Sequence, residues 1–184
     1  MNTGQTMITI GAMLLLAVTV LRVNQGFNST TNVLTESKLR VLAVSVATSI
    51  IEEATSKSFD QQSDTVSLSA TSQLTAVTSL GLDGSENSAN HKTLNDFDDY
   101  RCYKTTPMID SIQIFTNTPK MEFKAFIDVY YINPANPSVK STIKTWHKKM
   151  DIRVTSPALV NSAKPVLTYD TIKVSTIYSY WYFR

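Results

Sequence analysis

Hydrophobic residues are concentrated at the N-terminal end of the chain. No ionisable side chain precedes Arg22, and residues 7–21 (MITIGAMLLLAVTVL) are almost entirely apolar. A helix of about 20 uncharged residues, rising about 1.5 Å per residue, is long enough to cross the ~30 Å core of a bilayer. The pattern therefore predicts an N-terminal helix in a non-aqueous environment.

A helical pattern resumes after the first charge. Residues 24–28 form a polar interruption around Gly26, and because glycine costs about 1 kcal/mol inside a helix, we predict a break there. Apolar residues then recur at three- and four-residue spacing. They are Leu34, Leu39, Leu42, Val46 and Ile50. This second helix is amphipathic and is predicted to end at 58–60, so the first predicted part of the chain is residues 1–60.

Beyond this point the period changes to two, which is typical of strands. The predicted strands are 65–70, 109–117, 121–132, 139–155 with a bulge at 146–148, and 166–184. Sequential strands joined by short turns favour an antiparallel meander. The predicted fold class is therefore α+β: a long N-terminal hydrophobic-to-amphipathic helix followed by an antiparallel, sandwich-like β domain over 61–184.

Charge and cysteine content narrow the function classes. The 17 basic and 15 acidic residues are dispersed, which disfavours a nucleic-acid partner, since such proteins carry a basic patch or stripe. Cys102 is the sole cysteine, so no internal disulfide can form. A partly buried thiol is favoured over a nucleophile at this position.

The chain carries no recognisable catalytic, phosphate-binding or cofactor-binding motif. We therefore predict no enzyme activity, no metal and no cofactor. His91 and His147 lie among polar residues and are predicted to be solvated. The acidic segment 95–99, together with Asp83 and Glu86, is predicted to be a solvated turn-forming loop, with a site for a hard cation as the alternative.

Aromatic residues are dense at the C-terminal end. They are Tyr178, Tyr180, Trp181, Tyr182 and Phe183. Consecutive residues of a strand point to opposite faces, so some of these rings should leave the domain's own core. Exposed Tyr and Trp often mark interfaces. Contacts between subunits and ordinary packing of a last strand both remain open.

The N-terminal sequence Gly4-Gln5-Thr6-Met7-Ile8-Thr9, followed by the apolar helix, resembles the type IV pilins and pseudopilins. The resemblance covers about the first 60 residues. It implies leader cleavage between Gly4 and Gln5, and it places Gly26 where many pilins carry a helix-breaker. Thr9 occupies the position of the family's glutamate and Gln5 that of its usual aromatic residue. Cleavage and retention of the first residues both remain open.

The resemblance implies a structural subunit of an extracellular, pilus-like helical filament at the cell surface. Its partners would be copies of itself, the membrane before assembly and a pilus-type assembly machinery. Apolar side chains of the first helix would form the filament core: Met7, Ile8, Ile10, Met13, Leu14, Leu15, Leu16, Val18 and Leu21. The first alternative is a permanent single-span membrane protein, or a secretion-system pseudopilin, with an exposed β-rich binding domain. A membrane-tethered enzyme is the second.

Overall fold

The computed structural model describes residues 3–84, 86–112, 120–160 and 169–180. The chain divides into two compact units, Met1–Leu39 and Arg40–Arg184.

One helix, α1 (Thr3–Thr55), carries the whole N-terminal pattern. The predicted break at 24–28 is wrong, because α1 is continuous through Gly26. Helical hydrogen bonds on both sides outweigh a glycine cost of about 1 kcal/mol. The hydroxyls of Thr30 and Thr31 also donate to the carbonyl oxygens of Gly26 and Phe27, each at 2.9 Å. The polar groups of this stretch thus bond within the helix instead of opening it.

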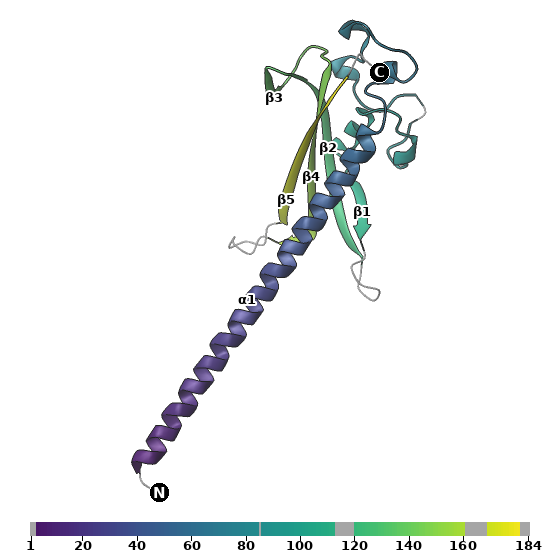
Figure 1. The fold of residues 1–184 in the computed structure, drawn as a ribbon. Coiled ribbons are helices and arrows are strands. Elements are labelled where there is room, and N and C mark those ends of the chain that lie inside the picture. Colours follow the sequence, from purple (N-terminus) through teal and green to yellow (C-terminus); the bar gives the residue numbers. More distant parts are fainter. Residues whose placement is uncertain (1–2, 85, 113–119, 161–168, 181–184) are drawn as a thin grey trace. The chain divides into compact units, whose positions relative to one another are not determined.

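The C-terminal unit contains an antiparallel sheet, drawn from green to yellow in Figure 1. Its strands are β1 (Met108–Ile112), β2 (Met121–Asn133), β3 (Asn136–Lys140), β4 (His147–Val160) and β5 (Tyr169–Ser179). They pair in the order β1-β2-β4-β5, with β3 pairing to the end of β2. The predicted α+β class with an antiparallel sheet is confirmed, and the described strands form a single sheet.

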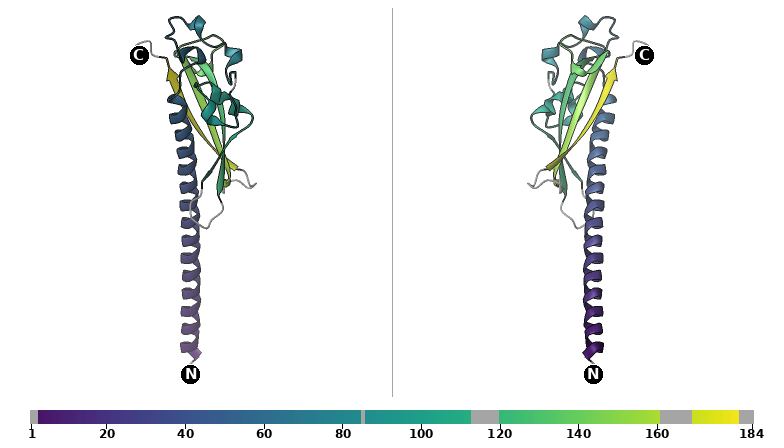
Figure 2. Two further views of the ribbon diagram at one scale, coloured as in Figure 1. Left: turned by 90° about the vertical axis from the view of Figure 1, so that its right-hand side faces the viewer. Right: turned by 90° about the vertical axis from the view of Figure 1, so that its left-hand side faces the viewer.

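The core lies on one face of this sheet. Buried residues of β2 and β4 face one another in register: Ala125 with Val154, Ile127 with Ile152, Val129 with Met150, and Tyr131 with Lys148. Residues 40–55 of α1 run alongside the sheet (Figure 2). Their buried side chains recur at helical spacing: Ala43, Val46, Ala47, Ile50 and Ala54. Small residues on this stripe allow the helix to lie close to its neighbours.

The segment between α1 and β1 is irregular and gathers around the C-terminal end of α1 (Figure 1). Its described residues include five short 3-10 helices: Gln61–Ser63, Thr71–Gln73, Val77–Ser79, His91–Thr93 and Asp99–Lys104. The predicted strand at 65–70 is wrong. Leu68, Leu74 and Leu80 are buried at six-residue intervals, so this loop is anchored by single leucines. The alternating apolar residues around Leu68, which predicted a strand, include only this one buried leucine.

The predicted strand 139–155 is divided into β3 and β4, and the predicted bulge at 146–148 is wrong. β4 begins at His147, and the Thr145 hydroxyl before it donates to the carbonyl oxygen of Ile132 at 2.7 Å. The remaining boundaries also differ. The structure shows 109–112 in β1 and 169–179 in β5, whereas 113–117, 166–168 and 181–184 lie outside the described residues.

Candidate functional site

The first candidate site is the apolar part of α1. By length and composition, α1 is able to cross a membrane. Its threonine hydroxyls donate to backbone oxygens of the preceding turn: Thr6 to Thr3 at 2.9 Å, Thr9 to Thr6 at 2.8 Å, and Thr19 to Leu15 at 2.7 Å. With these hydroxyls satisfied internally, the helix presents an apolar surface suited to lipid or to other apolar helices.

The predicted filament-core residues all lie on this exposed surface. They are Met7, Ile8, Ile10, Met13, Leu14, Leu15, Leu16, Val18 and Leu21, each at least half exposed. Gly4 and Gln5 lie in the first turns of α1, and no atom lies within 4 Å of where a Cβ on Gly4 would be. Burying one such Leu, Ile or Met stabilises by roughly 1.5–3 kcal/mol, so a surface of this kind favours a non-aqueous contact.

The second candidate site is a buried charged group in the C-terminal unit, which we call the Lys148 cluster: Lys148, Asp60, Asp98 and Tyr131. The Lys148 side chain is fully buried. Its Nζ donates to the Phe59 carbonyl oxygen at 2.7 Å, to Asp60 Oδ2 at 2.8 Å, and to Asp98 Oδ1. The ammonium group thus brings together β4, the segment after α1, and the loop before β1.

Asp60 is held as a carboxylate by several donors. Its oxygens accept the backbone N–H groups of Gln62 and Thr75, the Thr75 hydroxyl at 2.9 Å, and the Tyr131 hydroxyl at 3.0 Å. Burial acts to raise the pKa of Asp60, but Lys148 and the hydrogen bonds from Gln62 and Thr75 outweigh it, and the pKa is lowered. The same negative neighbour, added to burial, raises the pKa of Tyr131.

The acidic segment beside this cluster is buried, which corrects the predicted solvated loop. Asp96, Asp98 and Asp99 are at most 1 % exposed. Asp96 Oδ1 accepts the backbone N–H groups of Asp98 and Asp99, and Asp99 Oδ2 accepts those of Asn95 and Asp96. Burial and neighbouring carboxylates raise the pKa of Asp96 to about 8, and burial raises that of Asp99 to about 7. These carboxyl groups therefore hold protons far above the usual acidic range.

Cation binding by this segment finds no support in the geometry. Asp83 and Glu86 are joined instead by a hydrogen bond from the Asp83 backbone N–H to Glu86 Oε2 at 2.7 Å. Within residues 3–84, 86–112, 120–160 and 169–180, no group of three or more His, Cys, Asp or Glu residues is placed to hold a metal ion.

Tyr178 and Tyr180 are half-buried and pack within their own unit. The Tyr178 ring centroid lies 5.7 Å from that of Phe59 and 5.1 Å from that of Phe97. The Tyr180 ring stacks on Trp146 at 5.1 Å, and its hydroxyl accepts the backbone N–H of Leu68 at 2.8 Å. Contacts of these tyrosines with other subunits stay a prediction. The predicted contacts of Trp181, Tyr182 and Phe183 lie outside the described residues.

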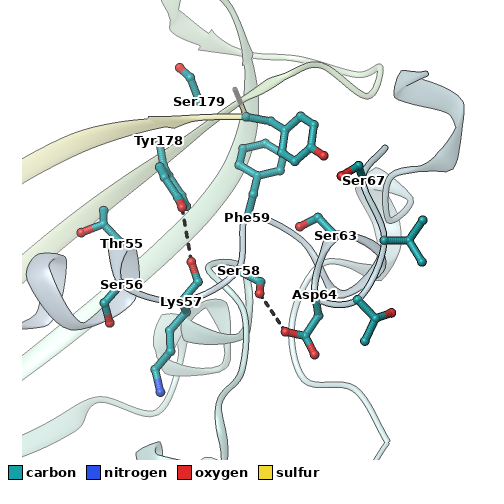
Figure 3. Close-up of a pocket in the computed structure, with 13 residues that line it drawn as sticks. Thr55, Ser56, Lys57, Ser58, Phe59, Ser63, Asp64, Ser67, Tyr178 and Ser179 are labelled. Atoms are coloured by element: carbon teal, nitrogen blue, oxygen red, sulfur yellow. Dashed lines mark hydrogen bonds between the residues drawn. The ribbon is translucent and has the colours of Figure 1, made fainter. Parts of the chain in front are cut away.

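A cavity of about 460 Å³ opens beside these rings (Figure 3). The end of α1, the segment 63–67 and the end of β5 line it. In Figure 3 the Tyr178 hydroxyl donates to the Lys57 carbonyl oxygen at 3.3 Å, and the Ser58 hydroxyl donates to Asp64 Oδ1 at 2.9 Å. These hydrogen bonds join the end of α1 to β5 and to the loop that follows α1, so the polar groups that line the cavity stabilise the fold.

Both histidines are part-buried and bonded, but the His91 side chain is still 42 % exposed, so the predicted solvation is wrong only in part. His91 Nδ1 lies 3.0 Å from Glu53 Oε1, beside a second cavity of about 620 Å³. His147 Nδ1 lies 2.7 Å from Ser179 Oγ. His147 and Ser179 are direct cross-strand partners of β4 and β5, which accounts for their contact without catalysis. Cys102 is half-buried, and burial raises the pKa of its thiol to about 11.

The role of Lys148 was not predicted from the sequence, although a signal is present. Met150, Ile152 and Val154 alternate on the buried face of β4, and continuing this alternation backward places Lys148 on the same face. A lysine at a core position requires buried carboxylates as partners. Segment 95–99 contains such carboxylates.

Comparison with known proteins gives no assignment: no family model, no curated protein and no solved structure matches this chain. The long apolar helix followed by an antiparallel sheet is a pilin-like architecture.

Proposed function

We propose that this chain is a structural subunit of an extracellular, pilus-like helical filament that polymerises through α1. The exposed apolar surface of α1 around residues 7–21 carries the proposal. Other copies of the same helix can cover such a surface continuously, and the C-terminal unit would then lie outside the core. Before assembly the helix would lie in a membrane, which its length and composition permit.

The test is to image material sheared from cells that express the full chain, and to cross-link it. Single cysteines replacing Leu14 or Val18, in a Cys102→Ser background, place thiols on the exposed apolar surface. Short bifunctional maleimides should convert a filament into a ladder of high multimers. Cysteine at Lys173, an exposed position of β5, is the matched control for cross-linking through the sheet instead of the helix.

A permanent single-span anchor is the second candidate, favoured by the same length and apolarity of α1. It predicts single copies in the membrane fraction, no filaments in sheared material, and no multimers beyond chance encounters at Leu14 and Val18. That result would refute the filament proposal. Leucine-to-lysine substitution at Leu15 weakens both arrangements, so it does not separate them, whereas the cross-linking pattern does.

A further inference from the structure

The Lys148 cluster brings an amine and a carboxyl group together under conditions that favour their condensation. Lys148 Nζ contacts Asp98 Oδ1, and both side chains are at most 2 % exposed. Asp60 Oδ2 lies 2.8 Å from the same nitrogen. Two reacting groups held in van der Waals contact react as if at very high concentration. We propose that Lys148 and Asp98 form an intramolecular amide bond between Nζ and Cγ, with Asp60 as the group that transfers protons.

Neighbouring strands and aromatic rings enclose the Lys148 side chain. Tyr131 of β2 and Tyr178 of β5 are its direct cross-strand neighbours, so β2 and β5 flank β4 on both sides at Lys148. Lys148 Nζ lies 4.6 Å from the centroid of the Phe59 ring and 5.3 Å from that of Tyr131. This low-dielectric enclosure favours the neutral acid form of the Asp98 carboxyl group. It also withholds the water that would reverse an amide bond.

The two carboxyl groups differ in a way that assigns their roles. Asp60 accepts hydrogen bonds from Gln62, Thr75 and Tyr131. Its pKa is lowered, first by Lys148 and then by the bonds from Gln62 and Thr75, so it is the ionised carboxylate of the two. Asp98 Oδ2 accepts a long 3.4 Å bond from the Gly81 backbone N–H, and burial raises the pKa of Asp98 despite Lys148. The protonated carboxyl is the electrophile, so Asp98 is the acceptor and Asp60 the base.

The step balances without a co-reactant. A proton passes from the Lys148 ammonium to the Asp98 carboxylate, which gives a neutral amine and a neutral acid. The Nζ lone pair attacks Cγ of Asp98, and a tetrahedral intermediate forms. The Asp60 carboxylate accepts a proton from Nζ and delivers it to the departing hydroxyl. The C–O bond breaks, one water molecule leaves, and the Nζ–Cγ amide remains, with no change in oxidation state.

Mass spectrometry of the purified full chain tests the proposal. The intact mass should be lower than the sequence mass by one water molecule. Trypsin should release one branched peptide that joins 93–101 to 145–149, because the acylated Lys148 is no longer cleaved. Peptide mapping locates the bond whatever the state of the N-terminus, and fragmentation separates it from dehydration of a single aspartate.

Four variants sharpen the result. Lys148→Met should show the full mass. Asp98→Asn should lose ammonia instead of water and give the same branched peptide, because both reactions leave the same amide. Asp60→Ala should leave Lys148 and Asp98 unlinked in a protein whose circular dichroism still shows helix and sheet. Lys149→Arg, one residue away and paired with Asp151 at 3.5 Å, is the matched control and should keep the bond.

Two results would overturn the inference. Wild-type protein with the full mass, and with separate peptides 93–101 and 145–148, would show a buried ion pair only. A branched peptide that persists at wild-type yield in folded Asp60→Ala would remove Asp60 from the reaction.

Discussion

The raised pKa of Asp96 predicts an unusual dependence of stability on pH. Its pKa is 3.8 in an ordinary peptide and about 8 in the folded chain. Between these values the folded state binds a proton that the unfolded state has lost. The free energy of unfolding therefore falls as pH rises, by about 1.4 kcal/mol per pH unit for this one group. Asp99, with a folded pKa of about 7, acts in the same direction.

Substituting Asp96→Asn removes this proton. Asn keeps the Oδ1 acceptor for the backbone N–H groups of Asp98 and Asp99, and places an amide nitrogen where Asp96 Oδ2 has no partner. An amide nitrogen left without an acceptor there costs about 1–3 kcal/mol at every pH. The pH-dependent effect is separate from this cost. From pH 5 to pH 8, the free energy of unfolding of the wild type should fall by about 4 kcal/mol more than that of the variant.

The assay is guanidinium denaturation of detergent-solubilised full chain at pH 5, 6.5 and 8, followed by tryptophan fluorescence. Trp146 reports on the folded C-terminal unit because its ring stacks on Tyr180. The Asp60 pKa is lowered, so its stabilising contribution is present above 3.8 and does not change within this window. Equal pH slopes for wild type and Asp96→Asn would show that Asp96 is ionised in the folded chain, and would refute the reasoning.

Three further predictions concern other parts of the molecule. Phe97 is a fully buried ring that packs on Tyr178, so Phe97→Ala should lower the free energy of unfolding by about 3–5 kcal/mol. The same denaturation assay measures this change, and a loss below about 1 kcal/mol would contradict the packing. Gly26→Ala should stabilise α1 by about 1 kcal/mol, because the helix is continuous at Gly26 and a Cβ there meets nothing within 4 Å. Amide hydrogen exchange at 24–28 should become slower, whereas a locally unwound helix would show no such slowing. Because its thiol pKa is about 11, Cys102 should react with iodoacetamide at pH 7.5 more slowly in folded than in denatured protein. The rate for the folded protein should increase as pH rises toward 11, and equal rates in both states would contradict the burial of Cys102.

The sequence predicted those elements whose pattern is long and unmixed. The apolar run of α1 and the alternation of β2 each extend over many residues, and both were predicted close to their observed bounds. Within the loop 61–104, the strand predicted at 65–70 is wrong, because leucines at six-residue spacing match neither a helical nor a strand period. The break at Gly26 was overestimated, because a local propensity was weighed without the hydrogen bonds of Thr30 and Thr31.

The exposed apolar residues of α1 could be predicted directly from the uncharged, apolar sequence of residues 7–21. The Lys148 cluster was not predicted: the alternation of β4 places Lys148 on the buried face, but its two aspartates lie far from it in the sequence. Asp96, Asp98 and Asp99 look like a solvated loop until the fold buries them. Burial of a charge depends on tertiary contacts, which no local pattern encodes.

The Lys148 cluster also has a consequence for the order of folding. Lys148 lies 88 residues from Asp60 and 50 residues from Asp98 in the chain, whereas β2, β4 and β5 pair through nearer neighbours. Contacts of high sequence separation form late, because closing long loops costs entropy before any contact rewards it. Until both aspartates arrive, a lysine on the inner face of β4 remains hydrated and keeps water in the unfinished core. We therefore expect the last water to leave this core only after the loop 61–104 has docked on the sheet. A chain in which this loop is misplaced would then keep a hydrated core.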